Sequence, residues 1–67
     1  MDPDANLREQ ETILQMYANT CGPVPEANTR LRELRQALEH WIDYGGFVPE
    51  WDSYPLATKY WAMRLGF

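Results

Sequence analysis

The side chains that could perform acid–base chemistry lie around residue 40. His40 is the only histidine of the chain, and Glu39 and Asp43 lie close to it in the sequence. Because histidine titrates near neutral pH, such a trio could transfer protons. On a helix, however, Glu39 points away from His40 and Asp43 lies on a solvated face. No nucleophile or substrate pocket accompanies them, so we interpret His40 as a surface histidine.

Cys21 and the carboxylates Glu50 and Asp52 are the other reactive candidates. Cys21 lies where the first predicted helix ends, and the helix dipole there opposes formation of a thiolate. Glu50 and Asp52 flank Trp51 in a loop that lacks the context of glycosidase carboxylates. We therefore expect this chain not to be an enzyme.

The ligand inventory also argues against a metal site or a cofactor. One cysteine and one histidine cannot build a zinc site of the Cys/His type, and one cysteine cannot form an intramolecular disulfide. A chain of 67 residues forms a single domain, residues 1–67, with a marginal core. Small domains usually gain stability from disulfides, a bound metal or a partner chain. Because the first two are excluded here, we expect self-association or binding to another protein.

The charge balance argues against nucleic acid as the main partner. The chain has ten acidic and six basic residues, which gives a net charge of -4. Nucleic-acid-binding domains instead carry an excess of Lys and Arg. The densest basic cluster is Arg30, Arg32 and Arg35, on the second of two helices joined by a tight turn. This arrangement is similar to a helix-turn-helix, although glutamates interrupt the cluster. DNA binding therefore stays the alternative function.

No part of the sequence indicates a membrane protein. No apolar run approaches the roughly 18 residues of a membrane span, and the acidic start Met1-Asp2-Pro3-Asp4 is unlike a signal peptide. The tail from Lys59 to Phe67 mixes aromatic residues with two cations, like an interfacial helix, but it is short. A single cysteine suits a reducing compartment. These features predict a cytoplasmic protein without a membrane partner.

The first predicted helix runs from Asp4 to about Thr20, with Asp2 or Asp4 as its cap. Gly22 is expected to provide the left-handed residue that ends it. The apolar face contains Leu7, Leu14, Tyr17 and Ala18, flanked by Ile13 and Met16. The residues expected to face solvent are Arg8, Glu9, Gln10, Glu11 and Gln15.

The second predicted helix runs from Glu26 to Tyr44 and has the strongest periodicity. Its apolar stripe contains Ala27, Leu31, Leu34, Leu38, Trp41 and Gly45. The spacing places Leu34 and Leu38 in the core. Arg35 and Glu39 lie four residues apart and could form an ion pair. Gly45-Gly46 is expected to end the helix, after which Phe47 could fold back onto Leu38 or Trp41.

Eight of the nine aromatic residues lie from Trp41 onward. A third helix is predicted at 55–65, with Ser53 as its cap. This helix is apolar over much of its circumference, so it must be buried or bind a partner. Tyr and Trp are enriched at binding hot spots. The candidate partner-binding residues are therefore Trp51, Tyr54, Tyr60, Trp61 and Phe67.

The predicted fold class is all-α: a helical hairpin plus a short third C-terminal helix. The hairpin has a wider apolar face than one short partner helix can cover. We therefore expect either that the third helix closes over it or that the chain self-associates into a helical bundle.

The run from Leu38 to Trp51, together with the start Met1-Asp2-Pro3, resembles small uncharacterised proteins of actinobacteria and their phages. The matching positions of the run are Leu38, Trp41, Gly45, Gly46, Phe47, Pro49 and Trp51. Ile42 and Val48 stand where leucine is commoner in those proteins. The resemblance implies a phage or bacterial source, with the host cytoplasm as location, and implies no catalytic residue.

These observations predict a non-enzymatic protein–protein interaction module. In a phage, such a protein could modulate a host protein by occupying it. The alternative is a small DNA-binding or regulatory protein, which a steep salt dependence of DNA retention would reveal.

Overall fold

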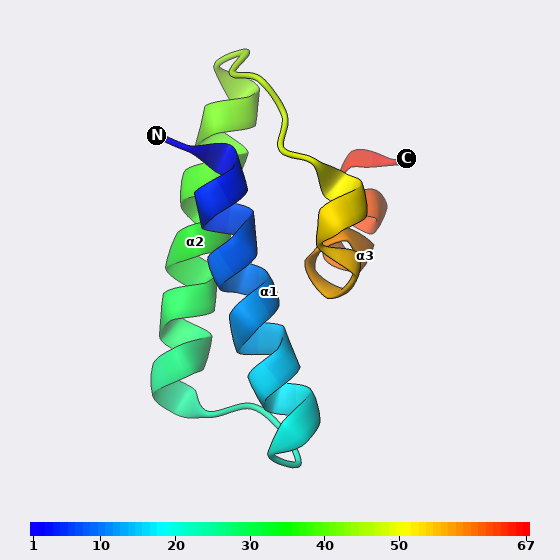
Figure 1. Cartoon of the computed structure of the whole chain (residues 1–67). Helices are drawn as coiled ribbons and strands as arrows, with labels where there is room; N and C mark the ends of the chain where they lie inside the picture. The colour runs from blue at the N-terminus through cyan, green and yellow to red at the C-terminus, as the bar shows by residue number, and fades with distance from the viewer.

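The computed structural model describes all 67 residues and contains three α-helices and no strand. Helix α1 spans Pro3–Asn19, α2 spans Pro25–Asp43 and α3 spans Pro55–Leu65, with a 3-10 turn η1 at Trp51–Ser53. In Figure 1, α1 and α2 form a long antiparallel hairpin, and the shorter α3 packs on its side. The predicted all-α hairpin with a third helix is therefore confirmed.

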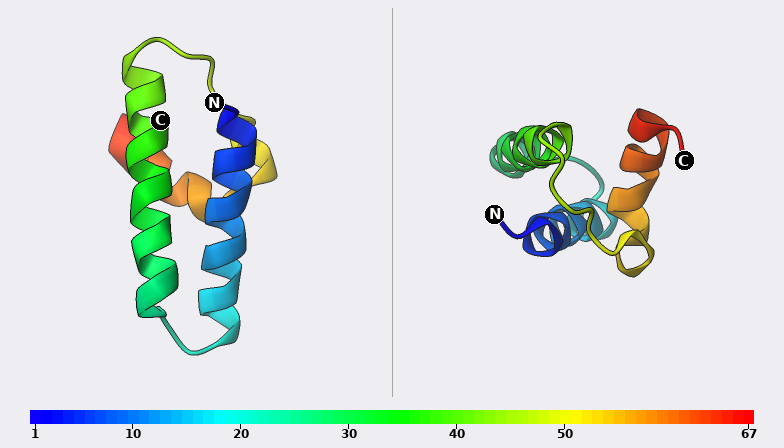
Figure 2. Two further views of the ribbon diagram at one scale, coloured as in Figure 1. Left: turned by 90° about the vertical axis from the view of Figure 1, so that its left-hand side faces the viewer. Right: turned by 90° about the horizontal axis from the view of Figure 1, so that it is seen from above.

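Helix α3 crosses the hairpin instead of running alongside it (Figure 2). Seen from above, the three helices form a triangle in which α3 begins level with α1 and ends level with α2 (Figure 2). Its first turn therefore meets α1, whereas its last turn reaches α2 only through side chains, such as Arg64 with Glu39. No helix of the chain is both long and apolar enough to cross a membrane.

Helix α1 begins with a side-chain cap and ends in a left-handed turn. The carboxylate of Asp2 accepts hydrogen bonds from the backbone N–H groups of Asp4 and Ala5, at 3.0 and 3.3 Å. At the other end both Cys21, with φ 64°, and Gly22, with φ 136°, have positive φ, so Cys21 shares the role that the sequence assigned to Gly22 alone. The Gly22 N–H closes the turn by donating to the carbonyl of Tyr17 at 3.2 Å.

The core consists of two apolar clusters along the hairpin. Ile13, Leu31 and Leu34 fill the part near the α1–α2 turn. The second cluster lies where α3 packs on the hairpin and contains Leu7, Leu38, Ala57 and Trp61. Leu34 and Leu38 are buried, as their spacing on α2 predicted.

Three polar residues of α1 are also buried, which corrects the expectation that Gln10 and Glu11 face solvent. Asn6, Gln10 and Glu11 lie beneath α2 and α3. Because α1 packs against both other helices, its buried arc is wider than a two-helix hairpin requires. Their polar atoms are paired inside the protein, which offsets the cost of taking them out of water.

A chain of hydrogen bonds through these residues joins the three helices. The Asn6 amide donates to the backbone carbonyl of Leu34 on α2 at 3.0 Å. Gln10 donates to the Asn6 side-chain oxygen at 2.6 Å and accepts from the Trp61 indole N–H at 3.0 Å. We call Asn6, Gln10 and Trp61 the polar relay. It specifies how α3 sits on the hairpin, because any shift of Trp61 would leave buried donors and acceptors unpaired.

The N-terminus of α3 is capped by a residue far away in the sequence. The Glu11 carboxylate accepts from the backbone N–H of Ala57 at 2.8 Å and of Leu56 at 3.3 Å, across 46 and 45 positions. A carboxylate there satisfies free N–H groups and opposes the positive end of the dipole. Ser53, the predicted cap, donates to Glu50 at 3.4 Å instead, and makes no capping bond.

Candidate functional site

The five aromatic residues predicted to bind a partner do not lie on one surface. Trp61 has no exposed area, so within the monomer it belongs to the core and cannot reach a partner. The physical reason is that its indole ring covers Leu7 and Leu38 while its N–H is held by Gln10. The tail therefore packs on its own chain, and the assignment of Trp61 to a binding surface is corrected.

The other four candidates surround Trp61. Tyr60 meets its ring edge-on at 5.1 Å, and Trp51 lies 6.2 Å from it. Phe67, the last residue, returns to lie 5.1 Å from the ring of Trp51 and stays 60% exposed. Tyr54 is half-buried against the same cluster. Of the predicted set, Phe67 is thus the residue most open to a partner, and the rest form the wall of the core.

The most exposed aromatic segment follows α2 and was not in the predicted set. Tyr44, Phe47 and Val48 are 87%, 65% and 56% exposed. We call the segment 44–48 the aromatic turn. It projects beyond the end of the hairpin in both side views (Figures 1 and 2). Its sequence signals were the glycine pair and the clustering of aromatic residues from Trp41 onward. Neither signal shows which of these rings stay exposed, because helical periodicity does not show where side chains point once a helix ends.

The aromatic turn is held in one conformation by its backbone. Gly45 adopts φ 83°, its N–H donates to the carbonyl of Ile42 at 3.0 Å, and the Gly46 N–H donates to that of Trp41 at 2.9 Å. These two bonds are the Schellman arrangement of helix ends. Gly46 has a second constraint, since a Cβ there would overlap the indole ring of Trp41.

Trp41 fixes the far side of the same turn. Its indole N–H donates to the Phe47 carbonyl at 2.7 Å, and the two rings meet edge-on at 5.4 Å. Of the two contacts predicted for Phe47, with Leu38 or with Trp41, the structure shows the one with Trp41, although most of the Phe47 ring remains in solvent. The Glu50 N–H donates to the Asp4 carboxylate at 2.8 Å, which ties the following loop to α1. The exposed rings are therefore presented by a fixed backbone.

A second exposed apolar surface lies at the end of α3. Met63 is 88% exposed and Leu65 is 43% exposed, and Phe67 follows them. We call these three residues the α3 end. The sequence indicated that α3 is apolar on most sides, and the structure shows that only the face of Ala57 and Trp61 is buried.

A polar cleft lies between α2 and α3, and it corrects the predicted ion pair of Arg35 with Glu39. Glu39 instead accepts from the Nε and Nη2 of Arg64 on α3, at 3.0 to 3.2 Å. The Cζ of Arg35 lies 3.9 Å from the centre of the Tyr60 ring. Arg35 thus packs on an aromatic face and has no carboxylate partner.

The residues weighed for catalysis are dispersed. His40 is exposed and lies beside the Tyr44 ring, with 6.3 Å between the ring centres. Cys21 is exposed at the opposite end of the hairpin. Glu50 and Asp52 lie with Trp51 around a surface hollow of about 360 Å³. No three His, Cys, Asp or Glu side chains converge as metal ligands would.

No protein-family model, curated protein or solved structure matches this chain.

Proposed function

We propose that this chain is a non-enzymatic protein–protein interaction module whose contact surface is the aromatic turn. The observation that supports this proposal most is the exposure of Tyr44, Phe47 and Val48 in a domain with only seven buried hydrophobic residues. Grouped exposed apolar side chains are typical of binding sites. Tyrosine and phenylalanine also provide large contact areas with few torsions to immobilise.

The rigidity of the turn supports the same proposal. Trp41 and Gly46 fix the backbone before any partner arrives. Binding would therefore cost little ordering entropy, which is the main benefit of a preorganised surface. The α3 end is a separate exposed apolar surface, which suits self-association with a second copy of the chain and not the contact that we propose for the aromatic turn.

The resemblance to proteins of actinobacteria and their phages suggests the partner. If a phage encodes the chain, its partner would be a host protein in the bacterial cytoplasm. The DNA-binding alternative has less support, because Arg30 is paired with Glu9 at 2.6 Å and Arg64 with Glu39 at 3.0 Å. These two pairs engage Arg30 and Arg64, and the four remaining cations, Arg8, Arg32, Arg35 and Lys59, are spread over three helices instead of forming one continuous basic face.

The test is affinity capture from an actinobacterial lysate with three matched baits. These are the wild type, the double variant Tyr44→Ser with Phe47→Ser, and the control Met63→Ser, which removes an equally exposed side chain from the other surface. We expect one protein to be retained by the wild type and the control, and lost with the double variant. Equal retention by all three baits would contradict a role for the aromatic turn. DNA retention with a steep salt dependence would favour the alternative.

A further inference from the structure

The cleft between α2 and α3 is lined by donor groups that have no acceptor within the chain. It is an open hollow of about 400 Å³, lined by one residue of α3, Tyr60, and five of α2: Asn28, Arg32, Arg35, Gln36 and Glu39. The side chains of Asn28, Arg32 and Gln36 make no hydrogen bond to the protein and stay exposed. The cleft therefore presents two guanidinium groups, two amides and a phenol to whatever enters it.

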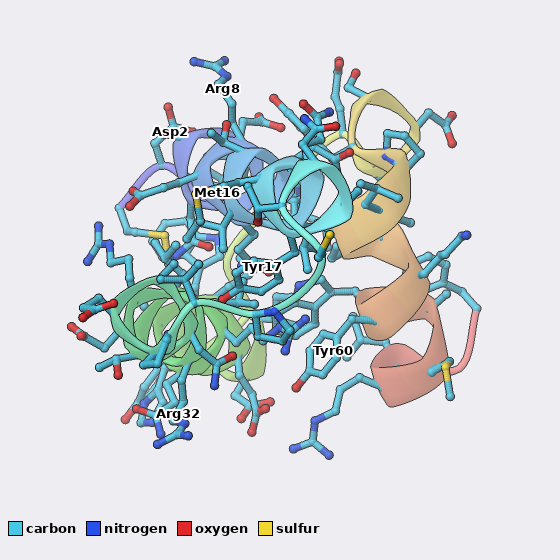
Figure 3. The ribbon with its side chains drawn as sticks, turned by 90° about the horizontal axis from the view of Figure 1, so that it is seen from below. Asp2, Arg8, Met16, Tyr17, Arg32 and Tyr60 are labelled. Carbon is cyan, nitrogen blue, oxygen red and sulfur yellow. The ribbon has the colours of Figure 1, made fainter.

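Arg35 is the group in this cleft that most needs a partner. Its Nε–H is buried and unpaired, and the hydroxyl of Tyr17 is buried and unpaired as well. Figure 3 shows Tyr17 pointing from α1 into the space between α2 and α3, and Tyr60 pointing from α3 toward α2. Burial lowers the pKa of Arg35, because removal from water disfavours its charged form. Because the Nε–H is inaccessible, an anion would reach Arg35 through the Nη groups of the same guanidinium, and its negative charge would offset part of the lost solvation.

The charges around the cleft leave an excess of positive charge. Glu39 is its only acidic residue, and both of its oxygens are engaged by Arg64. Arg32 and Arg35 have no such carboxylate. Two positive charges are therefore uncompensated in a chain whose net charge is -4.

We infer that this cleft binds a phosphate monoester between Arg32 and Arg35. A phosphate monoester carries a charge of about -1.5 to -2 at neutral pH, which matches two arginines, whereas a single carboxylate would leave one unmatched. Guanidinium groups bind phosphate oxygens with paired hydrogen bonds. The amides of Asn28 and Gln36 supply further donors, and the volume leaves room for the organic part of the ester. This inference is independent of the aromatic turn.

The test is a titration of the full chain at constant ionic strength, followed by nuclear magnetic resonance at the Arg35 Nε–H and the Tyr60 ring. The probes are phenyl phosphate, inorganic phosphate and acetate. We expect saturable shifts with both phosphates and at least about ten-fold weaker binding of acetate. A phosphotyrosine peptide then distinguishes the two possible sources of the phosphate monoester, a phosphorylated protein and a small-molecule ester. Tighter binding than phenyl phosphate indicates a phosphorylated protein, and equal binding indicates a small phosphate ester.

Arginine variants make the test specific. Arg32→Gln and Arg35→Gln should each weaken phenyl phosphate binding by about ten-fold. Arg8→Gln removes the same charge from an exposed arginine on the other side of the molecule and should leave binding unchanged (Figure 3). If Arg35→Gln fails to fold, Arg32→Gln still tests the binding site, because Arg32 is exposed and its replacement should not affect folding.

Four results would overturn the inference. They are shifts that do not saturate, an equal loss in Arg8→Gln, acetate binding as tight as phosphate, and a DNA duplex binding more tightly per phosphate than phenyl phosphate does.

Discussion

The indole N–H of Trp61 donates a 3.0 Å hydrogen bond to the side-chain oxygen of Gln10, and both residues are fully buried. Gln10 in turn donates to Asn6, which donates to the Leu34 carbonyl on α2. A large apolar ring thus covers the hairpin core, while a single polar atom determines where that ring can sit. Hydrophobic burial supplies most of the attraction between α3 and the hairpin, and the polar relay supplies its position.

The first prediction concerns the middle of the polar relay. Gln10→Ala leaves the Trp61 N–H and the Asn6 oxygen buried without partners, at a cost of about 1–3 kcal/mol for each group. We expect thermal unfolding, followed by circular dichroism, to show a loss of roughly 2–6 kcal/mol for the two groups together. Gln36→Ala is the control, since Gln36 lies exposed on α2 without a hydrogen bond. Equal stability of the two variants would contradict the relay.

A second prediction concerns the cap of α3. Glu11→Gln removes the negative charge from the start of that helix and should cost about 1–2 kcal/mol. The backbone N–H groups of Leu56 and Ala57 donate hydrogen bonds to this carboxylate. Hydrogen exchange in the variant should therefore accelerate more at these two residues than in α2. Glu33→Gln, at an exposed site on α2, controls for the change in net charge. Unchanged protection at Leu56 and Ala57 would show that the cap is not needed.

The third prediction separates two neighbouring glycines. Gly45→Ala forces an ordinary residue to φ 83°, at a cost of about 1–2 kcal/mol, but meets no neighbouring atom. Gly46→Ala places a methyl group in the Trp41 ring, which must move away from Phe47. Only Gly46→Ala should therefore change the nuclear magnetic resonance signal of the Trp41 indole N–H, which donates to the Phe47 carbonyl in the wild type. The same spectral change in both variants would contradict this packing.

The fourth prediction concerns pH. The hydrogen bond from Arg30 lowers the pKa of Glu9, and their charge attraction adds to this effect. Because the folded pKa lies below the unfolded one, the pair stabilises the protein above about pH 4.3 and is lost as the pH falls through the folded pKa. A resonance titration of Glu9 should show the lowered value, and Arg30→Gln should raise it. The two residues are largely exposed, so the melting temperature should change little.

The sequence predicted the helices well because local signals determine them. Proline, glycine and the leucine spacing of α2 placed every helix end within one residue of its observed position. Leu34 and Leu38 were predicted correctly, because a stripe that faces one partner helix follows from periodicity alone. Phe47 was expected to fold back onto Leu38 or Trp41, and the Schellman turn at Gly45 and Gly46 places it on Trp41.

The surroundings of α3 could not be predicted in the same way. Gln10 and Glu11 were predicted to face solvent because they are polar, and the periodicity of α1 does not show that a third helix packs against them. Their burial depends on contacts with residues more than 40 positions away, Ala57 and Trp61. The same contacts determine that Trp61 belongs to the core while Phe67 remains exposed. The ion pair of Glu39 with Arg64 was missed for this reason too.

Trp61 belongs to the core, while Phe67 remains exposed. The most direct test of this division is the thermal melting of two variants, Trp61→Ala and Phe67→Ala. It should be measured at a concentration low enough to exclude self-association. Loss of a buried tryptophan costs about 3–5 kcal/mol, which is comparable to the whole stability of a domain this small. We predict that Trp61→Ala loses cooperative melting or melts far below the wild type, whereas Phe67→Ala melts within a few degrees of it. A Trp61→Ala monomer that melts like the wild type would contradict the account, since Trp61 would then not belong to the core.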